Sequence, residues 1–183
     1  GHGYLLHEFF SPVANQRNDR YGGSFEGRVR IGLEVVGAIR AEWPAELPLF
    51  MRLSATDWID DRPSWTLADS IALARLVGPL GVDLIDCSSG SMVRSAAPPE
   101  TPGFQVPFAE AIRREAEIFT AAVGVITDPL QAEEIVASGR ADLVALGRAM
   151  LVDPHWPLRA ARTLGVEGLW PDQYLRARPT IVS

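Results

Sequence analysis

The chain has 183 residues and a formal net charge of -6 at pH 7, with 47% hydrophobic and 22% charged residues. This length suits one domain with a hydrophobic core, and the acidic charge argues against general binding of nucleic acid. The single cysteine allows no internal disulfide, no signal peptide is recognisable, and no apolar run approaches the about 20 residues that span a bilayer, so we expect a cytoplasmic protein that does not enter a membrane.

The first 24 residues are predicted to be irregular, because a short apolar patch is followed by a polar stretch. A stretch of this length exceeds an ordinary connection, so we expect it to be functional. Ser24 then suits the N-cap of a helix over residues 25–43. The chain begins abruptly at Gly1 without an initiator methionine, and we expect it to be a fragment or a processed form.

Four short apolar runs are predicted to be strands, and a helix follows each of them. The expected strands are residues 49–54, 82–87, 117–125 and 143–148, and the expected helices are residues 66–80, 108–116, 128–138 and 154–164. Asp128, Pro129 and Gly139 suit the two ends of the third of these helices. The tail, residues 165–183, is expected to be irregular. Such alternation predicts an α/β fold with a parallel sheet.

Two architectures fit this alternation: part of a (β/α)8 TIM barrel, or a small doubly wound sheet. The barrel is favoured because each expected strand ends in a polar or glycine-bearing loop, and a barrel gathers these ends on one face. No GxGxxG fingerprint follows any strand, which counts against a Rossmann domain. Since a barrel needs about 250 residues, we expect residues 1–183 to supply the second half of a single barrel domain, strands five to eight.

The ends of the last two strands are a candidate phosphate site. Gly124 ends one apolar run, and Gly147 and Arg148 end the next. Glycine lets the backbone approach a ligand closely, and arginine is a forked cation that suits phosphate. In (β/α)8 barrels the common phosphate site follows strands seven and eight. The alternative is a packing glycine beside a surface arginine.

Several segments together resemble the signature of one enzyme family. They are residues 2–6, 9–12 and 21–24 with Asn15, Arg17 and Asp19, and later Arg52, residues 86–90, Gly124, Gly147 and Arg148. The sequence resembles the old yellow enzyme family of flavin-dependent ene-reductases, and within it the bacterial NADPH dehydrogenases of the thermophilic-like branch. The first motif is long and specific, and the resemblance covers essentially the whole chain.

The resemblance implies a full-length barrel that binds FMN at the carboxyl ends of its strands. In that family NADPH reduces FMN, and the flavin then passes hydride to the β-carbon of an activated alkene while a proton is added at the α-carbon. The implied substrate is a small enone or a related α,β-unsaturated carbonyl compound. A homo-oligomer is implied as well, and no metal site is predicted.

Two residues near the start match the family's substrate site. His2 matches the second member of a pair, spaced i, i+3, that hydrogen-bonds the carbonyl oxygen of the substrate. Hydride addition builds enolate charge on that oxygen, and donors placed there stabilise the transition state. Tyr4 matches the proton donor, since a phenol keeps its proton at neutral pH and can deliver it to a carbanion-like carbon. The alternatives are an exposed terminal residue or a tag remnant for His2 and a core aromatic for Tyr4.

The remaining matches concern the cofactor. Arg52 matches the arginine beside the pyrimidine end of the flavin, where a fixed cation favours the reduced, anionic ring. Because an arginine inside an apolar strand is costly unless it is paired, Arg52 is a candidate on physical grounds too. Gly147 and Arg148 match contacts to the FMN phosphate, and Gly124 is expected to lend its backbone.

Two further positions bear on the assembly and on the first long helix. In the thermophilic-like branch a C-terminal arginine reaches into the active site of the neighbouring subunit, so Arg176 is a candidate substrate-binding residue, with Arg178 as a rival and a solvated tail as the alternative. Gly27 stands where the family usually has asparagine, and we expect it to loosen the start of the helix.

Two other functions stay open. A half-barrel that keeps the phosphate site could bind a phosphorylated ligand without catalysis, as a homodimer that completes a barrel, or the chain could be a structural fragment with no ligand. His2 together with Tyr4 favours the enzyme, because a phosphate-binding module has no use for that pair. The missing first half of the barrel favours the other two.

Overall fold

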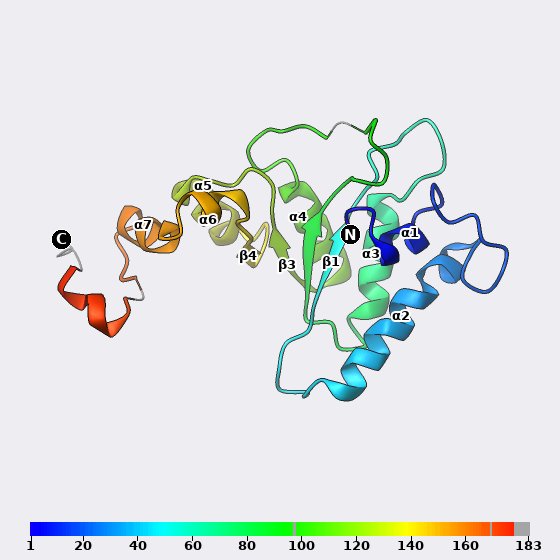
Figure 1. Ribbon diagram of the computed structural model, residues 1–183, viewed down its shortest axis with the longest axis horizontal. Coiled ribbons are helices and arrows are strands. Elements are labelled where there is room, and N and C mark those ends of the chain that lie inside the picture. Colours follow the sequence, from blue (N-terminus) through cyan, green and yellow to red (C-terminus); the bar gives the residue numbers. More distant parts are fainter. Residues whose placement is uncertain (97, 169, 178–183) are drawn as a thin grey trace.

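The computed structural model of the chain describes residues 1–96, 98–168 and 170–177. Its strands form one parallel sheet in the order β1-β2-β3-β4 (Figure 1). The strands are β1 (Phe50–Ser54), β2 (Leu84–Ser88), β3 (Phe119–Ala122) and β4 (Leu143–Val144). The order follows the chain without a reversal, whereas a doubly wound sheet reverses its strand order at a switch point. The predicted parallel α/β sheet is therefore confirmed, and its order is that of a barrel wall.

Helices connect the strands and flank the sheet. They are α1 (Leu5–Phe10), α2 (Phe25–Glu42), α3 (Leu67–Val77), α4 (Val106–Ala116), α5 (Pro129–Ala137), α6 (Arg148–Val152) and α7 (Trp156–Thr163), with a 3-10 helix, η1 (Asp172–Ala177), near the end. The expected caps are confirmed, since the side chain of Ser24 accepts a hydrogen bond from Gly27 N–H and that of Asp128 accepts one from Leu130 N–H.

Four short elements differ from the prediction. The segment expected to be irregular at the start contains α1, and the tail contains η1. The last strand was expected over residues 143–148 but ends at Val144, and α6 begins at Arg148. Helices of five or six residues are too short for an apolar period to show, so the pattern could not reveal them.

The start of α2 also differs from expectation. Gly27 was expected to loosen it, but a Cβ built at Gly27 would lie only 2.2 Å from the carbonyl oxygen of Gly22. Glycine therefore lets the loop before α2 pack directly on the first helical turn, and it tightens this junction.

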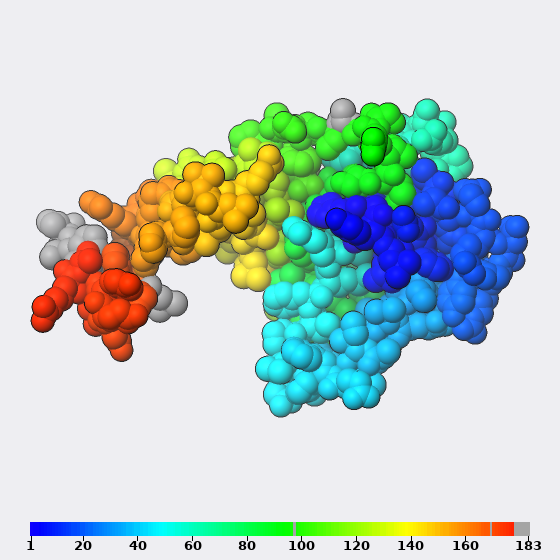
Figure 2. Space-filling view, viewed as in Figure 1, coloured from blue at the N-terminus to red at the C-terminus, as the bar shows by residue number. Residues whose placement is uncertain are grey.

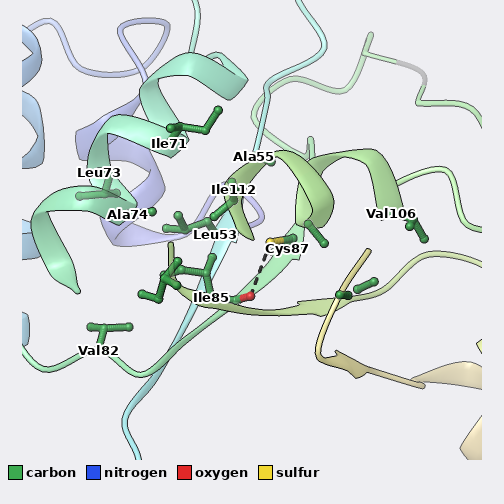
Figure 3. Close-up of a cluster of buried hydrophobic side chains, with 14 of the residues drawn as sticks. Leu53, Ala55, Ile71, Leu73, Ala74, Val82, Ile85, Cys87, Val106 and Ile112 are labelled. Carbon is green, nitrogen blue, oxygen red and sulfur yellow. Dashed lines mark hydrogen bonds between the residues drawn. The ribbon is translucent and has the colours of Figure 1, made fainter. Parts of the chain in front are cut away.

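One face of the sheet carries the hydrophobic core. Alternate strand side chains pack there with residues of α3 and α4, and Figure 3 shows this cluster, which includes Leu53, Ile85, Cys87, Leu73 and Ile112. Burial of these apolar side chains, worth about 25 cal/mol per Å² of apolar area removed from water, is the main term that stabilises the fold.

The N-terminal segment is tied to this core by stacked aromatic rings. Trp65, which is 1% exposed, lies just before α3. Its ring centroid is 5.4 Å from that of Phe10 in α1 and 6.0 Å from that of Phe25 in α2. The segment that precedes α2 is therefore packed on the fold at defined points.

The opposite face of the sheet exposes large apolar side chains. Phe50, Phe119 and Leu143 are 55%, 63% and 47% exposed, and the strand register places Phe50 and Phe119 on either side of Leu84. In a closed barrel this face points to the packed interior. An apolar patch of this kind marks a surface that another part of a protein covers.

The C-terminal elements extend away from the sheet. In Figure 2 the orange and red residues, which include α7 and η1, project from one side of the body formed by the first four helices and the sheet. Within the ranges that the structure describes, no helix combines the length and the apolar character needed to cross a membrane.

Cys87 lies in the core and is expected to be chemically inert. Burial, with the nearby Asp86 carboxylate, raises the pKa of its thiol well above the usual range. Because the thiolate is the reactive form, an aromatic disulfide reagent at neutral pH should leave the folded protein unmodified and titrate its one cysteine after unfolding in guanidinium chloride. Rapid modification of the folded protein would contradict this burial.

Candidate active site

His2 lies over the carboxyl ends of the first two strands. Its backbone N–H donates to Oγ of Ser54, the last residue of β1, at 2.7 Å, and its Nε2 is hydrogen-bonded to the hydroxyl of Ser88, the last residue of β2. Ser54 Oγ in turn donates to the carbonyl oxygen of Gly90 at 3.1 Å. Figure 1 shows the N-terminus beside this end of β1. The loop ends that a barrel gathers on one face therefore hold His2 directly.

The imidazole of His2 is neutral in this setting. Burial lowers the pKa of His2 below its ordinary value, and the positive charge of Arg52 lowers it further. A neutral imidazole has one N–H donor and one acceptor nitrogen. With Nε2 on Ser88, His2 retains Nδ1 for a ligand.

Arg52 is paired across the sheet, as its place in an apolar strand led us to expect. In the parallel register it lies opposite Asp86 of β2, and its Nε is 2.8 Å from Asp86 Oδ2. The Arg52 side chain is 45% exposed, on the face opposite to the core. Burial raises the pKa of Asp86, and the charge of Arg52 partly offsets this. The pair presents the Arg52 cation beside His2, while the Asp86 carboxylate is the less exposed of the two groups.

Tyr4 is presented to the outside. It precedes α1 as the N-cap residue and is 76% exposed, so the core-aromatic alternative is wrong. Within the described parts of the chain its hydroxyl has no hydrogen-bond partner. The phenol is thus free to meet a ligand near His2, two residues away.

A buried polar cluster lies beneath this segment. The N–H of Gly3 donates to His7 Nδ1 at 2.9 Å, and His7 Nε2 is 2.8 Å from Asp57 Oδ1. Asp57 Oδ2 accepts hydrogen bonds from the Ser11 hydroxyl at 2.6 Å and from the Trp65 N–H at 2.8 Å. Burial alone would raise the pKa of Asp57, but these hydrogen bonds hold it below its usual value. Asp57 is therefore a buried carboxylate with all its partners in place.

Gly124 follows β3 in a strained turn. Its φ is 123°, and that of Val125 is 51°, a value that β-branched residues rarely adopt. A Cβ at Gly124 would lie 2.9 Å from the side-chain nitrogen of Gln105 and 3.0 Å from the ring of Phe104. Close packing thus accounts for this glycine. The strain of the turn is of the kind found at ligand clamps, about 1–3 kcal/mol for each such residue.

Gly147 and Arg148 lie just after β4, the strand next to β3 in the sheet, and both are exposed. A Cβ added at Gly147 would meet no heavy atom within 4 Å, so its backbone is open to a ligand. Among the residues that the structure covers, Arg148 has no hydrogen-bond or ion-pair partner. The sheet therefore orders the candidates from His2 and Arg52 at β1, past Gly124 at β3, to Arg148 after β4.

Arg176 is not part of this arrangement. It lies in η1, the red segment at the far end of the molecule from the N-terminus in Figure 1. It does not reach the site of its own chain, so its predicted role depends on a neighbouring subunit. Arg178 lies outside the described residues.

Comparison with known proteins places the chain in a family. The model of the NADH:flavin oxidoreductase / NADH oxidase family matches residues 1–167. The chain belongs to this family. The resemblance to old yellow enzymes is thereby confirmed.

Curated relatives of the chain are named NADPH dehydrogenases. That of Halalkalibacterium halodurans is 49% identical over 176 residues, which are 96% of this chain and 51% of the relative. That of a Geobacillus strain is 52% identical over 164 residues, 90% of this chain and 47% of the relative, and that of Bacillus subtilis is 48% identical over 175 residues, 96% and 50%. The chain spans about half the length of the curated relatives it matches. FMN and NADPH, the expected cofactors, are those that the family and these names indicate.

Solved structures confirm the fold. The complex of 2-naphthoyl-CoA reductase with 2-naphthoyl-CoA superposes with a TM-score of 0.81 at 28% identity, over 89% of this chain and 25% of that chain. Morphinone reductase in complex with tetrahydroNAD gives a TM-score of 0.68 at 26% identity, over 94% of this chain and 44% of that chain. The flavin oxidoreductase chain thus forms about half of a (β/α)8 barrel.

Several residues of the site were missed from the sequence. Asp86 was part of the matching segment 86–90, but its pairing with Arg52 was missed, although it stands in the middle of the strand expected beside the one that holds Arg52. The contact between His7 and Asp57 had no signal, because 50 positions separate the two residues.

Gln105 was also missed, and it ties together three strand ends. Its side-chain oxygen accepts a hydrogen bond from Ser89 Oγ at 2.6 Å, and its nitrogen donates to the carbonyl oxygen of Val123 at 2.9 Å. Trp58, after β1, donates to the same serine hydroxyl at 2.9 Å. Gln105 thereby helps to hold the loops that follow β1, β2 and β3 in fixed positions relative to one another.

Two cavities lie away from this edge of the sheet. One of about 680 Å³ is lined by residues at the amino ends of β2 and β3, among them Asp83 and Phe119. The other, of about 1090 Å³, lies between α7 and η1. Neither includes a residue of the candidate site. The face that the other half of a barrel would cover is open, and an open face does not enclose a cavity.

Proposed function

We propose that this chain forms part of an FMN-dependent oxidoreductase that uses NADPH to reduce the activated C=C bond of an α,β-unsaturated carbonyl compound. The observation that carries the proposal is the position of His2, held over the carboxyl ends of β1 and β2 beside the cation of Arg52, with the exposed Tyr4 two residues along the chain. Membership in a flavin oxidoreductase family and relatives named NADPH dehydrogenases support the cofactors.

The residues present fit FMN. The exposed guanidinium of Arg148 and the open backbone at Gly147 suit a phosphate group. At the other end of the sheet, Arg52 offers a cation fixed by Asp86 for a ring that becomes negative when it is reduced. When bound, FMN supplies a carrier that takes hydride from NADPH and gives it to the alkene.

Substrate orientation is the proposed task of His2. Its neutral ring, held by Ser88 and by Ser54, offers Nδ1 to the carbonyl oxygen of the enone, with the ring hydrogen on that nitrogen. Negative charge develops on this oxygen as the β-carbon accepts hydride, and a donor that is already in place stabilises it without reorganisation. The positive charge of Arg52 acts in the same direction.

Proton delivery is the proposed task of Tyr4. Its exposed hydroxyl has no competing partner among the residues described here and follows His2 by two positions. It gives its proton to the α-carbon, which completes the reduction of the double bond. Arg176 of a neighbouring subunit is proposed to complete the substrate pocket in a homo-oligomer.

The test is a flavin-binding and turnover assay that includes the Arg148→Ala variant. The purified protein incubated with FMN and desalted should keep a visible flavin band, the band should bleach with NADPH under anaerobic conditions, and an enone should restore it. The loss of a charge-assisted phosphate contact, about 1.5–3 kcal/mol, should raise the Kd for FMN about 10- to 150-fold in Arg148→Ala. Arg114→Ala, which removes an exposed arginine on α4, is the matched control.

A phosphate-binding half-barrel without catalysis is the second candidate, because the exposed Arg148 and the open backbone at Gly147 would suit a phosphorylated ligand equally well. It predicts that FMN is retained through Arg148 but that NADPH and an enone leave the flavin band unchanged. A protein that retains no flavin would contradict both candidates.

A further inference from the structure

We propose that His7 and Asp57 form a buried positioning pair that holds the peptide between His2 and Tyr4 in the shape that the active site requires. The inference rests on the proposed roles of His2 and Tyr4, because it assigns the device that fixes their geometry. Neither His7 nor Asp57 touches the substrate in this proposal.

The peptide between the two residues is strained and therefore needs support. His2 has a φ of 59° and Gly3 a φ of 72°, so two successive residues lie in the left-handed region. Such a conformation costs about 1–3 kcal/mol at a residue other than glycine and persists only where the surroundings impose it. A Cβ at Gly3 would lie 2.5 Å from the carbonyl oxygen of Ser91, so this turn is also tightly enclosed.

The contact that imposes the shape comes from His7. The N–H of Gly3, the amide at the centre of the strained turn, donates to His7 Nδ1 at 2.9 Å. An Nδ1 that accepts a hydrogen bond carries no hydrogen, so the ring hydrogen is on Nε2, where it is donated to Asp57 Oδ1 at 2.8 Å. The two contacts require the same tautomer, and each reinforces the other.

Asp57 is anchored by Ser11, which follows α1, and by Trp65, which precedes α3. Its second oxygen accepts from the hydroxyl of Ser11 and from the N–H of Trp65, and its own N–H donates to the carbonyl oxygen of Trp65 at 2.9 Å. The Asp57 side chain is 0% exposed and that of His7 2%. A rigid line of contacts therefore runs from the segment before α3 to the turn that presents His2 and Tyr4.

Two substitutions of His7 separate positioning from stability. In His7→Asn the side-chain oxygen lies close to the place of Nδ1 and can accept from Gly3, but the side chain is too short to reach Asp57. In His7→Gln the side-chain nitrogen lies close to the place of Nε2 and can donate to Asp57, but nothing accepts from Gly3.

The proposal predicts opposite outcomes for the two variants. His7→Gln should keep most of its resistance to urea and lose about 100-fold in kcat for alkene reduction, since a shift of about 1 Å in a reacting group has this effect. His7→Asn should unfold at lower urea and lose kcat per folded molecule by a smaller factor than His7→Gln, because it keeps the acceptor for Gly3 but loses the Asp57 anchor. A loss of kcat in both variants that follows only their loss of folded protein would overturn the proposal.

Hydrogen exchange at the Gly3 amide, followed by NMR in the whole protein, provides a readout that needs no turnover. The amide should exchange about tenfold faster in His7→Gln than in the wild type, and the increase should be smaller in His7→Asn. If the wild type reduces no alkene, the proposed function is wrong, while the Gly3 rates still decide whether His7 holds the turn. Equal rates in all three proteins would show that it does not.

Discussion

Replacing Tyr4 with phenylalanine should slow alkene reduction by about 100- to 10,000-fold, the range that a positioned general acid contributes. The substitution removes one hydroxyl from a side chain that is 76% exposed, so it leaves no cavity and no unpaired partner. FMN affinity and the rate at which NADPH reduces the flavin should stay as in the wild type, because the proton is needed only when the alkene is reduced.

Stopped-flow absorbance can separate the two half-reactions of this variant. Flavin bleaching by NADPH and flavin recovery with a cyclic enone are recorded in separate experiments on Tyr4→Phe and the wild type. Tyr174→Phe is the matched control, because this exposed tyrosine lies in η1, away from the sheet. Normal recovery in Tyr4→Phe would mean that another group donates the proton.

Replacing Asp57 with alanine should lower the free energy of unfolding by about 3–5 kcal/mol. The substitution leaves the Ser11 hydroxyl, the Trp65 N–H and the His7 ring without their acceptor, and each buried group left unpaired costs about 1–3 kcal/mol. Urea unfolding followed by fluorescence of the tryptophans measures the change. Asp60→Ala, at an exposed aspartate three positions along the same loop, should change the free energy by less than about 0.5 kcal/mol.

The effect of Asp57 should depend on pH in a defined direction. Its hydrogen bonds hold the pKa of Asp57 below the ordinary value despite burial, so the folded state favours the ionised form. Its contribution to stability is therefore complete above about pH 4, the unfolded value, and is lost as the pH falls through the lower folded pKa. The difference between the wild type and Asp57→Ala should narrow below that pH, and a difference that grows on acidification would contradict the assignment.

The sheet was largely predictable because its signals are local. Apolar runs bounded by glycine, proline and acidic caps located the strands and the long helices to within a few residues, and the capping roles of Ser24 and Asp128 followed from their side-chain chemistry. The prediction failed for the short elements. The helices α1 and α6 and the strand β4 contain too few residues for an apolar period to appear.

The candidate site was predictable only in part, because its supports are not local. His2, Tyr4 and Arg52 follow from the resemblance, and the place of Arg52 in an apolar strand pointed to a charged partner. The partner itself, Asp86, depends on the register between two strands, in which it lies 34 positions from Arg52. The contact of Asp57 with His7 in α1 joins residues 50 positions apart. Patterns within one sequence do not reveal contacts between residues that lie so far apart along the chain.

The hydrogen-bonded ladder of the sheet narrows from one side to the other. Five residue pairs join β1 to β2, four join β2 to β3, and two join β3 to β4. Short, exposed ends open at a lower free energy than long, buried ones. We therefore expect the edge that carries Gly147 and Arg148 to open more readily than the edge that holds His2, and in the proposed function this edge is the phosphate end of the FMN site.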